Sequence, residues 1–217
     1  YYTLQMISYL MDISSGKIHA DHSIVDFVVY ASFFPTLIQG PITRFNEIKD
    51  SIHAGNPITY QNLKFGSQRI LFGLMKKMII ADRLDPAVSK IFTSYTQDGL
   101  FSLIGAVLCT IQLYMDFSGI VDICLGSAEI FGIKLPENFR QPFFAENASD
   151  FWRRWHITLG TFLRDYVFYP ISLAKPTRSL SKFFTKHFGK AAGKFIGPFI
   201  ALFAVWFLNG LWHGPYW

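Results

Sequence analysis

The sequence predicts an all-α, polytopic membrane protein whose helices include broken or re-entrant segments. The composition is the first sign: 51% of the 217 residues are hydrophobic, 18% are aromatic and only 16% are charged, against about 25% charged residues in an average soluble protein. The second sign is the run Phe195–Trp212, which carries no charged side chain. About 18 apolar residues suffice to cross a bilayer as a helix.

Five apolar blocks are the predicted membrane segments. In chain order they are residues 1–13, which look like the end of a segment, residues 23–38, which Pro35 breaks, residues 70–81, which Lys76 and Lys77 interrupt, residues 100–133 and residues 195–212. The chain starts at Tyr1 without an initiator Met or a signal-peptide pattern. We therefore expect residues 1–217 to be a single catalytic core, truncated at both ends.

The stretch Ser32–Arg44 combines apolar side chains with two prolines and one glycine within seven residues. Such backbone is tolerated at membrane depth only where protein or water satisfies it. It predicts either a re-entrant or broken helix that lines a cavity or a helix that ends at the interface. Residues 44–68 are polar enough for a loop with a surface helix, and Gly40-Pro41, Pro57 and Pro86 predict turns.

Asp116 and Asp122 lie in a largely apolar region and are six residues apart. That spacing points them in different directions on a straight helix, so they do not form a paired acid and base. Acidic groups inside a membrane usually pair with bases. We expect structural ion pairs, with Arg153, Arg154 or Arg164 as the partners.

Asn147 predicts a helix N-terminus, with Asp150 at the third helical position of a relaxed capping box. Trp152, Trp155, His156, Leu159 and Leu163 follow the spacing of one helix face. His156 then lies on an apolar, aromatic face, where a histidine is more often a packed core residue than a catalyst. Pro170 is expected to end this helix.

Residues 175–194 carry six basic side chains and no acidic one. Lys182, Lys186, Lys190 and Lys194 repeat every four residues, which on one helix would form a stripe interleaved with phenylalanines. This pattern predicts a cytoplasmic, basic amphipathic segment on an anionic membrane surface. Nucleic-acid binding is disfavoured, because apolar segments flank the run on both sides. A solvated loop that only sets topology is the simpler alternative.

His213 closes the last apolar run, four residues after Asn209, so both lie on one helix face. A histidine buried in lipid needs a polar partner or a hydrated cavity, and its ordinary pKa suits proton transfer. The alternative is an interfacial helix end, where Trp and His often occur. Cys109 and Cys124 have no zinc-site spacing, and no Walker, GxGxxG, HExxH or GxSxG motif occurs. We expect no metal site and no bound cofactor.

Two histidines in apolar surroundings suit acyl transfer to a hydroxyl, with a neutral imidazole as general base. Six short motifs follow each other along the chain. They are Gln39-Gly40-Pro41-Ile42 with Arg44, Asp116-Phe117-Ser118-Gly119, Pro136-Glu137-Asn138-Phe139, residues 150–156, Leu163-Arg164-Asp165-Tyr166 and residues 210–214. Together and in this order they resemble the membrane-bound O-acyltransferase family, most closely its bacterial alginate O-acetylation branch, which strengthens the interpretation as an acyltransferase.

The resemblance implies a helical bundle around a central funnel in the bacterial inner membrane. It implies that His213 is the catalytic histidine and His156 the second active-site residue. It further implies a cytoplasmic acyl-thioester donor, either acetyl-CoA or an acyl-carrier protein, an extracytoplasmic polysaccharide as acceptor, and an esterase-like acyltransferase partner outside the membrane. D-alanyl transfer to teichoic acid is the alternative within the family. A transporter or flippase, or a non-catalytic scaffold, is the alternative outside it.

Overall fold

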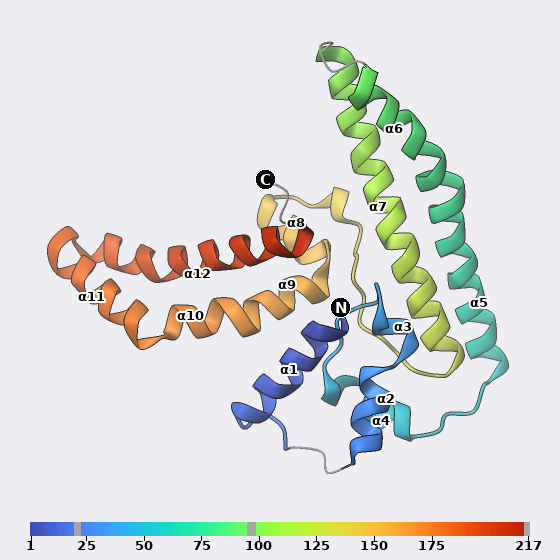
Figure 1. The fold of residues 1–217 in the computed structure, drawn as a ribbon, viewed down its shortest axis with the longest axis horizontal. Helices are drawn as coiled ribbons and strands as arrows, with labels where there is room; N and C mark the ends of the chain where they lie inside the picture. The colour runs from blue at the N-terminus through green and yellow to red at the C-terminus, as the bar shows by residue number, and fades with distance from the viewer. Residues whose placement is uncertain (20–22, 95–98, 215–217) are drawn as a thin grey trace. The chain divides into compact units, whose positions relative to one another are not determined.

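The computed structural model describes residues 1–19, 23–94 and 99–214, and every regular element among them is a helix (Figure 1). The all-α prediction is confirmed. The chain divides into two compact units, Tyr1–Trp155 and His156–Trp217. The first unit holds the N-terminal helices and a long helical pair, and the second is a run of helices that ends in a hairpin.

Four short helices open the first unit: α1 (Tyr2–Ser14), α2 (Ile24–Ala31), α3 (Phe34–Leu37) and α4 (Phe45–His53). They enclose a small core of Tyr9, Tyr30, Phe45 and Ile48. The Tyr30 hydroxyl donates to the carbonyl of Thr43 at 2.9 Å, and the ring of Tyr30 packs edge-on against Phe45. This core, and not a long helix, accounts for the first two apolar blocks.

The predicted break between Ser32 and Arg44 is present, since α3 forms one turn and is followed by irregular chain up to α4. Gly40 permits the turn that follows α3, because a Cβ at this position would collide with the carbonyl oxygen of Pro35. The predicted surface helix in residues 44–68 corresponds to α4, although Phe45 and Ile48 of this helix are buried.

The long helical pair consists of one helical run against one helix. The run comprises α5 (Tyr60–Leu74), a π-helical segment (Met75–Ala81) and α6 (Asp82–Ser94), and it packs along α7 (Gly99–Ile130) (Figure 1). Glycines set the closest approach. A Cβ on Gly66 would lie 2.6 Å from the carbonyl oxygen of Gly126, and one on Gly73 would lie 2.5 Å from that of Gly119. Small residues of this kind let membrane helices approach closely.

After α7, an extended segment leads through a 3₁₀ turn (Pro142–Phe144) to α8 (Ala148–Arg154). The cap prediction is confirmed, because the Asn147 side chain accepts from the backbone nitrogen of Asp150 at 2.9 Å. The capping box itself is modified. The Asp150 carboxylate accepts from the nitrogen of Glu146, one residue before the cap.

The second unit contains α9 (Ile157–Leu163), a π-helical segment (Arg164–Phe168), α10 (Tyr169–Leu173), α11 (Lys175–Phe188) and α12 (Lys190–His213). The prediction of one helix face running from Trp152 to Leu163 is wrong, because α8 ends at Arg154 and α9 begins at Ile157. The prediction that Pro170 ends the helix is also wrong.

Pro86 likewise lies inside α6 and not in a turn. Both prolines follow a π-helical segment.

The basic stretch forms a helical hairpin of α11 and α12, which differs from the expected continuous stripe. Gly189, with φ of 88°, ends α11 and lets the chain reverse before Lys190. Lys182 and Lys186 therefore lie on one helix and Lys190 and Lys194 on the next.

Two helices among the described residues are long and apolar enough to cross a membrane, namely α7 with 32 residues and α12 with 24. They correspond to two of the five predicted blocks, and α12 runs through Pro198 without interruption. The block at residues 70–81 lies within the run that packs along α7.

Candidate active site

His156 is held in an unusual backbone conformation at the start of α9. Its φ and ψ are 46° and 53°, in the left-handed region, and among the described residues only Gln141 shares a positive φ without being glycine. Histidine is enriched among the rare non-glycine residues found there. Strained conformations of this kind cluster at functional sites. The His156 carbonyl accepts from the nitrogen of Gly160 at 3.0 Å, so the residue also caps its helix.

The side chain of His156 is buried, with 5% of its surface exposed. Burial, and to a smaller extent the positive charge that His213 can carry, lower the pKa of His156 to about 3. The imidazole is therefore neutral at physiological pH. The charge effect also shows that the two histidine rings lie within electrostatic range of each other inside the second unit.

His213 is the last residue of α12 and is exposed. Asn209 lies one turn earlier in the same helix and is half-buried. The second unit thus contains both histidines that the sequence singles out, 57 positions apart in the chain. One is buried and neutral, and the other is open to its surroundings.

The residue that precedes His156 is fixed by an aromatic cluster of the first unit. The ring of Trp155 stacks on Phe151 at 5.7 Å and meets Phe139 edge-on at 5.1 Å. Tyr114 of α7 packs against Phe139 and lies 6.0 Å from Trp155. The end of α8 is further fixed by a backbone hydrogen bond from Arg140 to the carbonyl of Arg154. These contacts therefore fix the backbone on the N-terminal side of His156.

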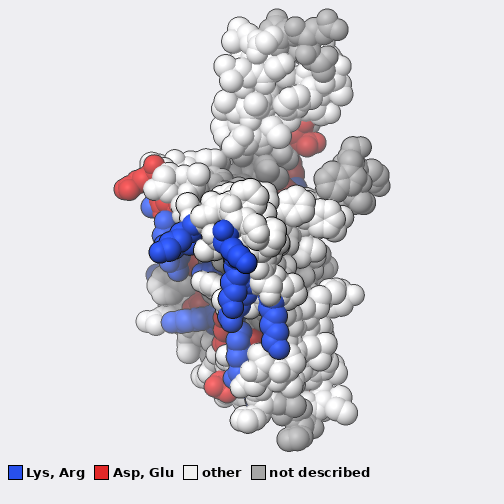
Figure 2. All heavy atoms as spheres, turned by 90° about the vertical axis from the view of Figure 1, so that its left-hand side faces the viewer, with Lys and Arg blue, Asp and Glu red and all other residues white. Residues whose placement is uncertain are grey.

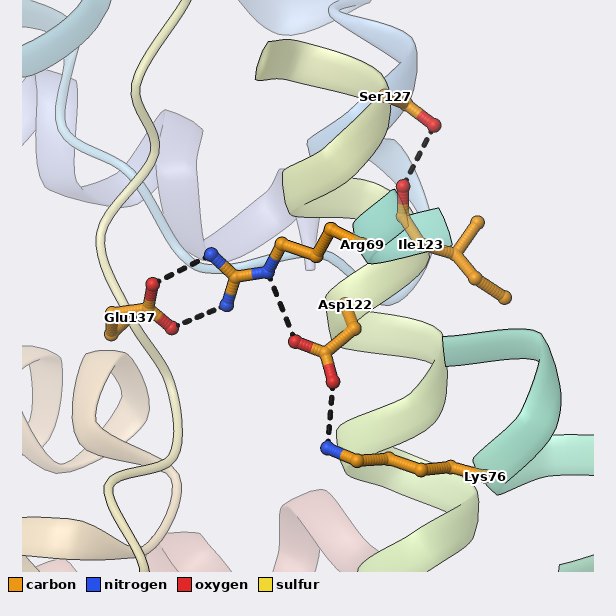
Figure 3. A network of polar contacts seen from close by, with 6 residues as sticks. All are labelled: Arg69, Lys76, Asp122, Ile123, Ser127 and Glu137. Atoms are coloured by element: carbon orange, nitrogen blue, oxygen red, sulfur yellow. Dashed lines mark hydrogen bonds and ion pairs between the residues drawn. The ribbon is translucent and has the colours of Figure 1, made fainter. Parts of the chain in front are cut away.

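A network of charged side chains links α5, α7 and the extended segment after α7 (Figure 3). Arg69 donates to both oxygens of Glu137 at 2.7 and 2.6 Å and, through Nε, to Asp122 at 3.0 Å. Lys76 donates to the other oxygen of Asp122 at 2.7 Å. Bidentate pairs of arginine with carboxylate are the strongest hydrogen-bonded ion pairs in proteins.

The structural role predicted for Asp116 and Asp122 is confirmed, but the predicted partners are wrong. Asp116 pairs with Lys77 at 2.7 Å, and Asp122 pairs with Arg69 and Lys76. Arg154 instead pairs with Asp150 and Arg164 with its neighbour Asp165, both within a few residues. In the sequence, Lys76 and Lys77 interrupt an apolar block. This interruption was the feature that could have identified them as the partners of Asp116 and Asp122.

Among the described residues, no group of three His, Cys, Asp or Glu side chains is placed to hold a metal ion. The two cysteines are free thiols in α7.

Comparison with known proteins adds an independent line of information. A family model for membrane-bound O-acyltransferases matches residues 1–217. The chain is 36% identical to a protein of Pseudomonas aeruginosa named probable alginate O-acetylase AlgI, over 99% of this chain and 38% of the relative.

Two further relatives differ in the group and acceptor that their names give. The chain is 32% identical to the peptidoglycan O-acetyltransferase of Helicobacter pylori, over 100% of this chain and 43% of the relative. It is 31% identical to the teichoic acid D-alanyltransferase of Bacillus subtilis, over 77% of this chain and 43% of the relative. The chain thus spans about two fifths of the length of these relatives.

Proposed function

This chain belongs to the membrane-bound O-acyltransferase family, and from that premise we propose that it forms the catalytic part of a multi-pass enzyme of the bacterial inner membrane. The enzyme moves an acyl group, in the first instance acetyl, from a cytoplasmic thioester donor towards hydroxyl groups of an extracytoplasmic polysaccharide. His213 is the general base and His156 orients or polarises the reacting groups. The observation that supports this assignment is a buried His156 whose lowered pKa also depends on the charge of the exposed His213 in the same unit.

The proposed reaction needs one proton acceptor and one polar neighbour. The acceptor hydroxyl gives its proton to the His213 imidazole while its oxygen attacks the thioester carbonyl carbon. The new C–O bond forms as the C–S bond breaks, and the proton held by His213 returns to the departing sulfur. The pKa of His156, lowered to about 3, makes this residue a weak base but a stable neutral hydrogen-bonding group. The two histidines therefore suit different roles.

The donor is an acyl thioester, acetyl-CoA or an acylated carrier protein. The acceptor lies outside the cell, where an esterase-like acyltransferase completes the transfer. Broken helices around a central funnel would join the two sides. Support comes from the relatives named for O-acetylation of alginate and of peptidoglycan and from the interrupted backbone between Ser32 and Arg44.

Coverage of the relatives favours acetyl over D-alanyl transfer. The relatives named for O-acetylation align over nearly all of this chain, whereas the D-alanyltransferase of Bacillus subtilis aligns over 77%. D-alanyl transfer to teichoic acid remains the second candidate, because that relative shares 31% identity. Supplying purified membranes with labelled acetyl-CoA or with D-alanyl carrier protein, and measuring label in polysaccharide, separates the two.

The test of the proposed function is replacement of His213 with Ala in the complete protein in its native cell. We expect polysaccharide acetylation to fall by about a hundredfold or more, since general base catalysis contributes that much. His187→Ala is the matched control, because His187 is an exposed histidine of the same unit. Membrane levels of both variants are measured by immunoblot. Undiminished acetylation in the His213→Ala strain would remove the assigned role.

A further inference from the structure

The hairpin of α11 and α12 is closed by small side chains. On α12, Gly193, Gly197 and Ala201 repeat every four residues and are buried. A Cβ on Gly193 would collide with the hydroxyl of Thr185, and one on Gly197 would lie 3.4 Å from that of Ser181. The face of α11 that meets α12 is therefore the face that carries Ser181 and Thr185.

The two flanks of α11 beside this contact differ in character. Arg178, Lys182 and Lys186 follow each other at intervals of four residues and are exposed. By helical periodicity they lie on one side of the contact face, and Leu180 and Phe183 lie on the other side. The exposed fractions of Leu180 and Phe183 are 39% and 50%. A helix with one basic and one apolar flank is typical of a helix that lies in a membrane interface.

The hairpin also collects the basic residues of α12 on the same side. Lys190 and Lys194 are exposed in the first turns of α12. The two helices run in opposite directions, so side chains at the same angle from the contact face of each helix lie on the same side of the hairpin. Lys190 and Lys194 therefore lie beside the basic flank of α11. Figure 2 shows Lys and Arg side chains gathered on the side that holds the closed end of the hairpin. The sequence has no acidic residue after Asp165, so no carboxylate of the hairpin neutralises this charge.

We propose that this basic flank, defined as Lys175, Arg178, Lys182, Lys186, Lys190 and Lys194, binds the phosphates of anionic phospholipids in the bilayer that holds α12. Charge complementarity favours a phosphate-bearing occupant. The apolar flank favours a phospholipid over a soluble phosphate compound. Leu180 and Phe183 would contact the acyl chains of a lipid, and a soluble phosphate compound has no apolar group for them to contact. The continuous apolar surface of α12 beyond Lys194 places the flank at the level of the headgroups. The inference is independent of acyl transfer.

The test uses the complete protein in detergent and native mass spectrometry, with phosphatidylglycerol and phosphatidylcholine as probes. The variant Arg178→Gln/Lys182→Gln/Lys186→Gln removes three positive charges from the basic flank. Each basic residue near an anionic surface contributes about fivefold in binding, so the affinity for phosphatidylglycerol should fall on the order of a hundredfold at low salt. Affinity for phosphatidylcholine should stay unchanged.

The matched control is Lys64→Gln/Arg83→Gln/Lys90→Gln, which removes the same charge from exposed positions of the first unit. It should keep wild-type affinity for phosphatidylglycerol. Equal losses in both variants would mean that net charge alone attracts the lipid, and this would overturn the proposal. Full competition by coenzyme A at the same phosphate concentration would overturn it as well, because the flank would then be a site for a soluble phosphate ligand.

The apolar flank provides a second readout. Leu180→Ser/Phe183→Ser should weaken binding of phosphatidylglycerol at least several-fold, because the side chains no longer enter the acyl region. Binding of glycerophosphoglycerol, which has the headgroup without acyl chains, should not change. If the double variant bound the intact lipid as tightly as the wild type, the membrane-interface geometry would be wrong.

Discussion

At the residue scale, the buried imidazole of His156 links stability to pH. The pKa of His156 falls from its ordinary value of about 6.5 in the unfolded chain to about 3 in the folded protein. The unfolded state therefore binds more protons between these two values, and stability is fully present above about pH 6.5 and declines as the pH falls.

The expected result is a loss of about 2 kcal/mol of stability between pH 6.5 and pH 5 in the wild type, since each pH unit in this window is worth about 1.4 kcal/mol. His156→Gln should show a flatter dependence, because glutamine does not titrate. Thermal unfolding in detergent at a series of pH values measures both. His187→Gln, at an exposed site, should keep the wild-type slope, and an equally steep slope in His156→Gln would contradict the assignment.

The same residue shows what a single sequence can reveal about a site. The role of His156 in catalysis rests on the family resemblance and stays a prediction. Its burial was predictable, because the sequence places it among apolar and aromatic residues. Its left-handed backbone was not. That conformation depends on the end of α8 being fixed by the Arg140–Arg154 hydrogen bond and by the packing of Trp155, which are contacts between segments distant in sequence.

At the element scale, the approach of α5 to α7 depends on four glycines. Gly126→Ala would place a methyl group 2.6 Å from the carbonyl oxygen of Gly66, and backbone cannot move aside as a side chain does. We expect a loss of about 1–3 kcal/mol, typical of overpacking. The unfolding midpoint in detergent measures it.

Gly99→Ala is the control within the same helix. Its new methyl group would meet no heavy atom of the described residues within 4 Å. This variant should stay within about 1 kcal/mol of the wild type, because Ala also favours the helix. Equal effects of the two substitutions would show that the glycines do not set the helix spacing.

The charge network makes a second prediction at this scale. Arg69→Leu leaves Glu137 without its bidentate partner and Asp122 with Lys76 alone. The expected destabilisation is about 2–3 kcal/mol, as for hydrogen bonds to charged groups. Adding Glu137→Gln to Arg69→Leu should restore part of it, because the uncompensated charge disappears.

Chemical denaturation of the purified protein measures these differences. Arg153→Leu is the control, since the Arg153 side chain is exposed and bonds only to Ser149 in its own helix. A double variant no more stable than Arg69→Leu alone would show that the network does not work through charge balance.

The elements themselves were predictable to different degrees. Helices α7 and α12 follow directly from long apolar runs. Helix α1, which corresponds to the block at residues 1–13, buries polar side chains; the Gln5 amide donates to the Thr43 hydroxyl at 3.0 Å. Periodicity of apolar residues does not reveal such a partner. The continuation of helices through Pro86 and Pro170 was not predictable from the sequence either.

At the scale of the whole molecule, the length of α12 predicts topology. Its 24 residues form an unbroken helix about 36 Å long, which is longer than the hydrocarbon core and can cross it at a strong tilt. The proposed role of His213 requires this tilt, because His213 ends the helix and has to meet a donor that arrives from the cytoplasmic side. The hairpin end is the basic one and is therefore expected in the cytoplasm. A cysteine at Ser179 should react with a membrane-impermeant maleimide only from the cytoplasmic side.

A cysteine at Leu211 should be protected from reagent on that side. Both substitutions are made in a background in which Cys109 and Cys124 are replaced by serine. Modification of the Ser179 position from outside the cell would reverse the predicted orientation.

Membership in the family was predictable from six short motifs in order, since each marks residues with a particular local role. The division of the chain between Trp155 and His156 was not. The division coincides with His156, whose left-handed backbone lies between the end of α8 and the start of α9.

The π-helical segment Met75–Ala81 has a consequence for how this molecule tolerates insertions and deletions. Such a segment accommodates one surplus residue, so that the helix faces before and after it keep the phase of an ordinary helix that is one residue shorter. A deletion within the regular part of α5 would turn everything on one side of it by about 100°, and Gly66 and Arg69 would rotate away from α7. A deletion of Met78 would instead convert the π-helical segment into ordinary helix with little rotation, so it should be less harmful than a single-codon deletion in the middle of α5.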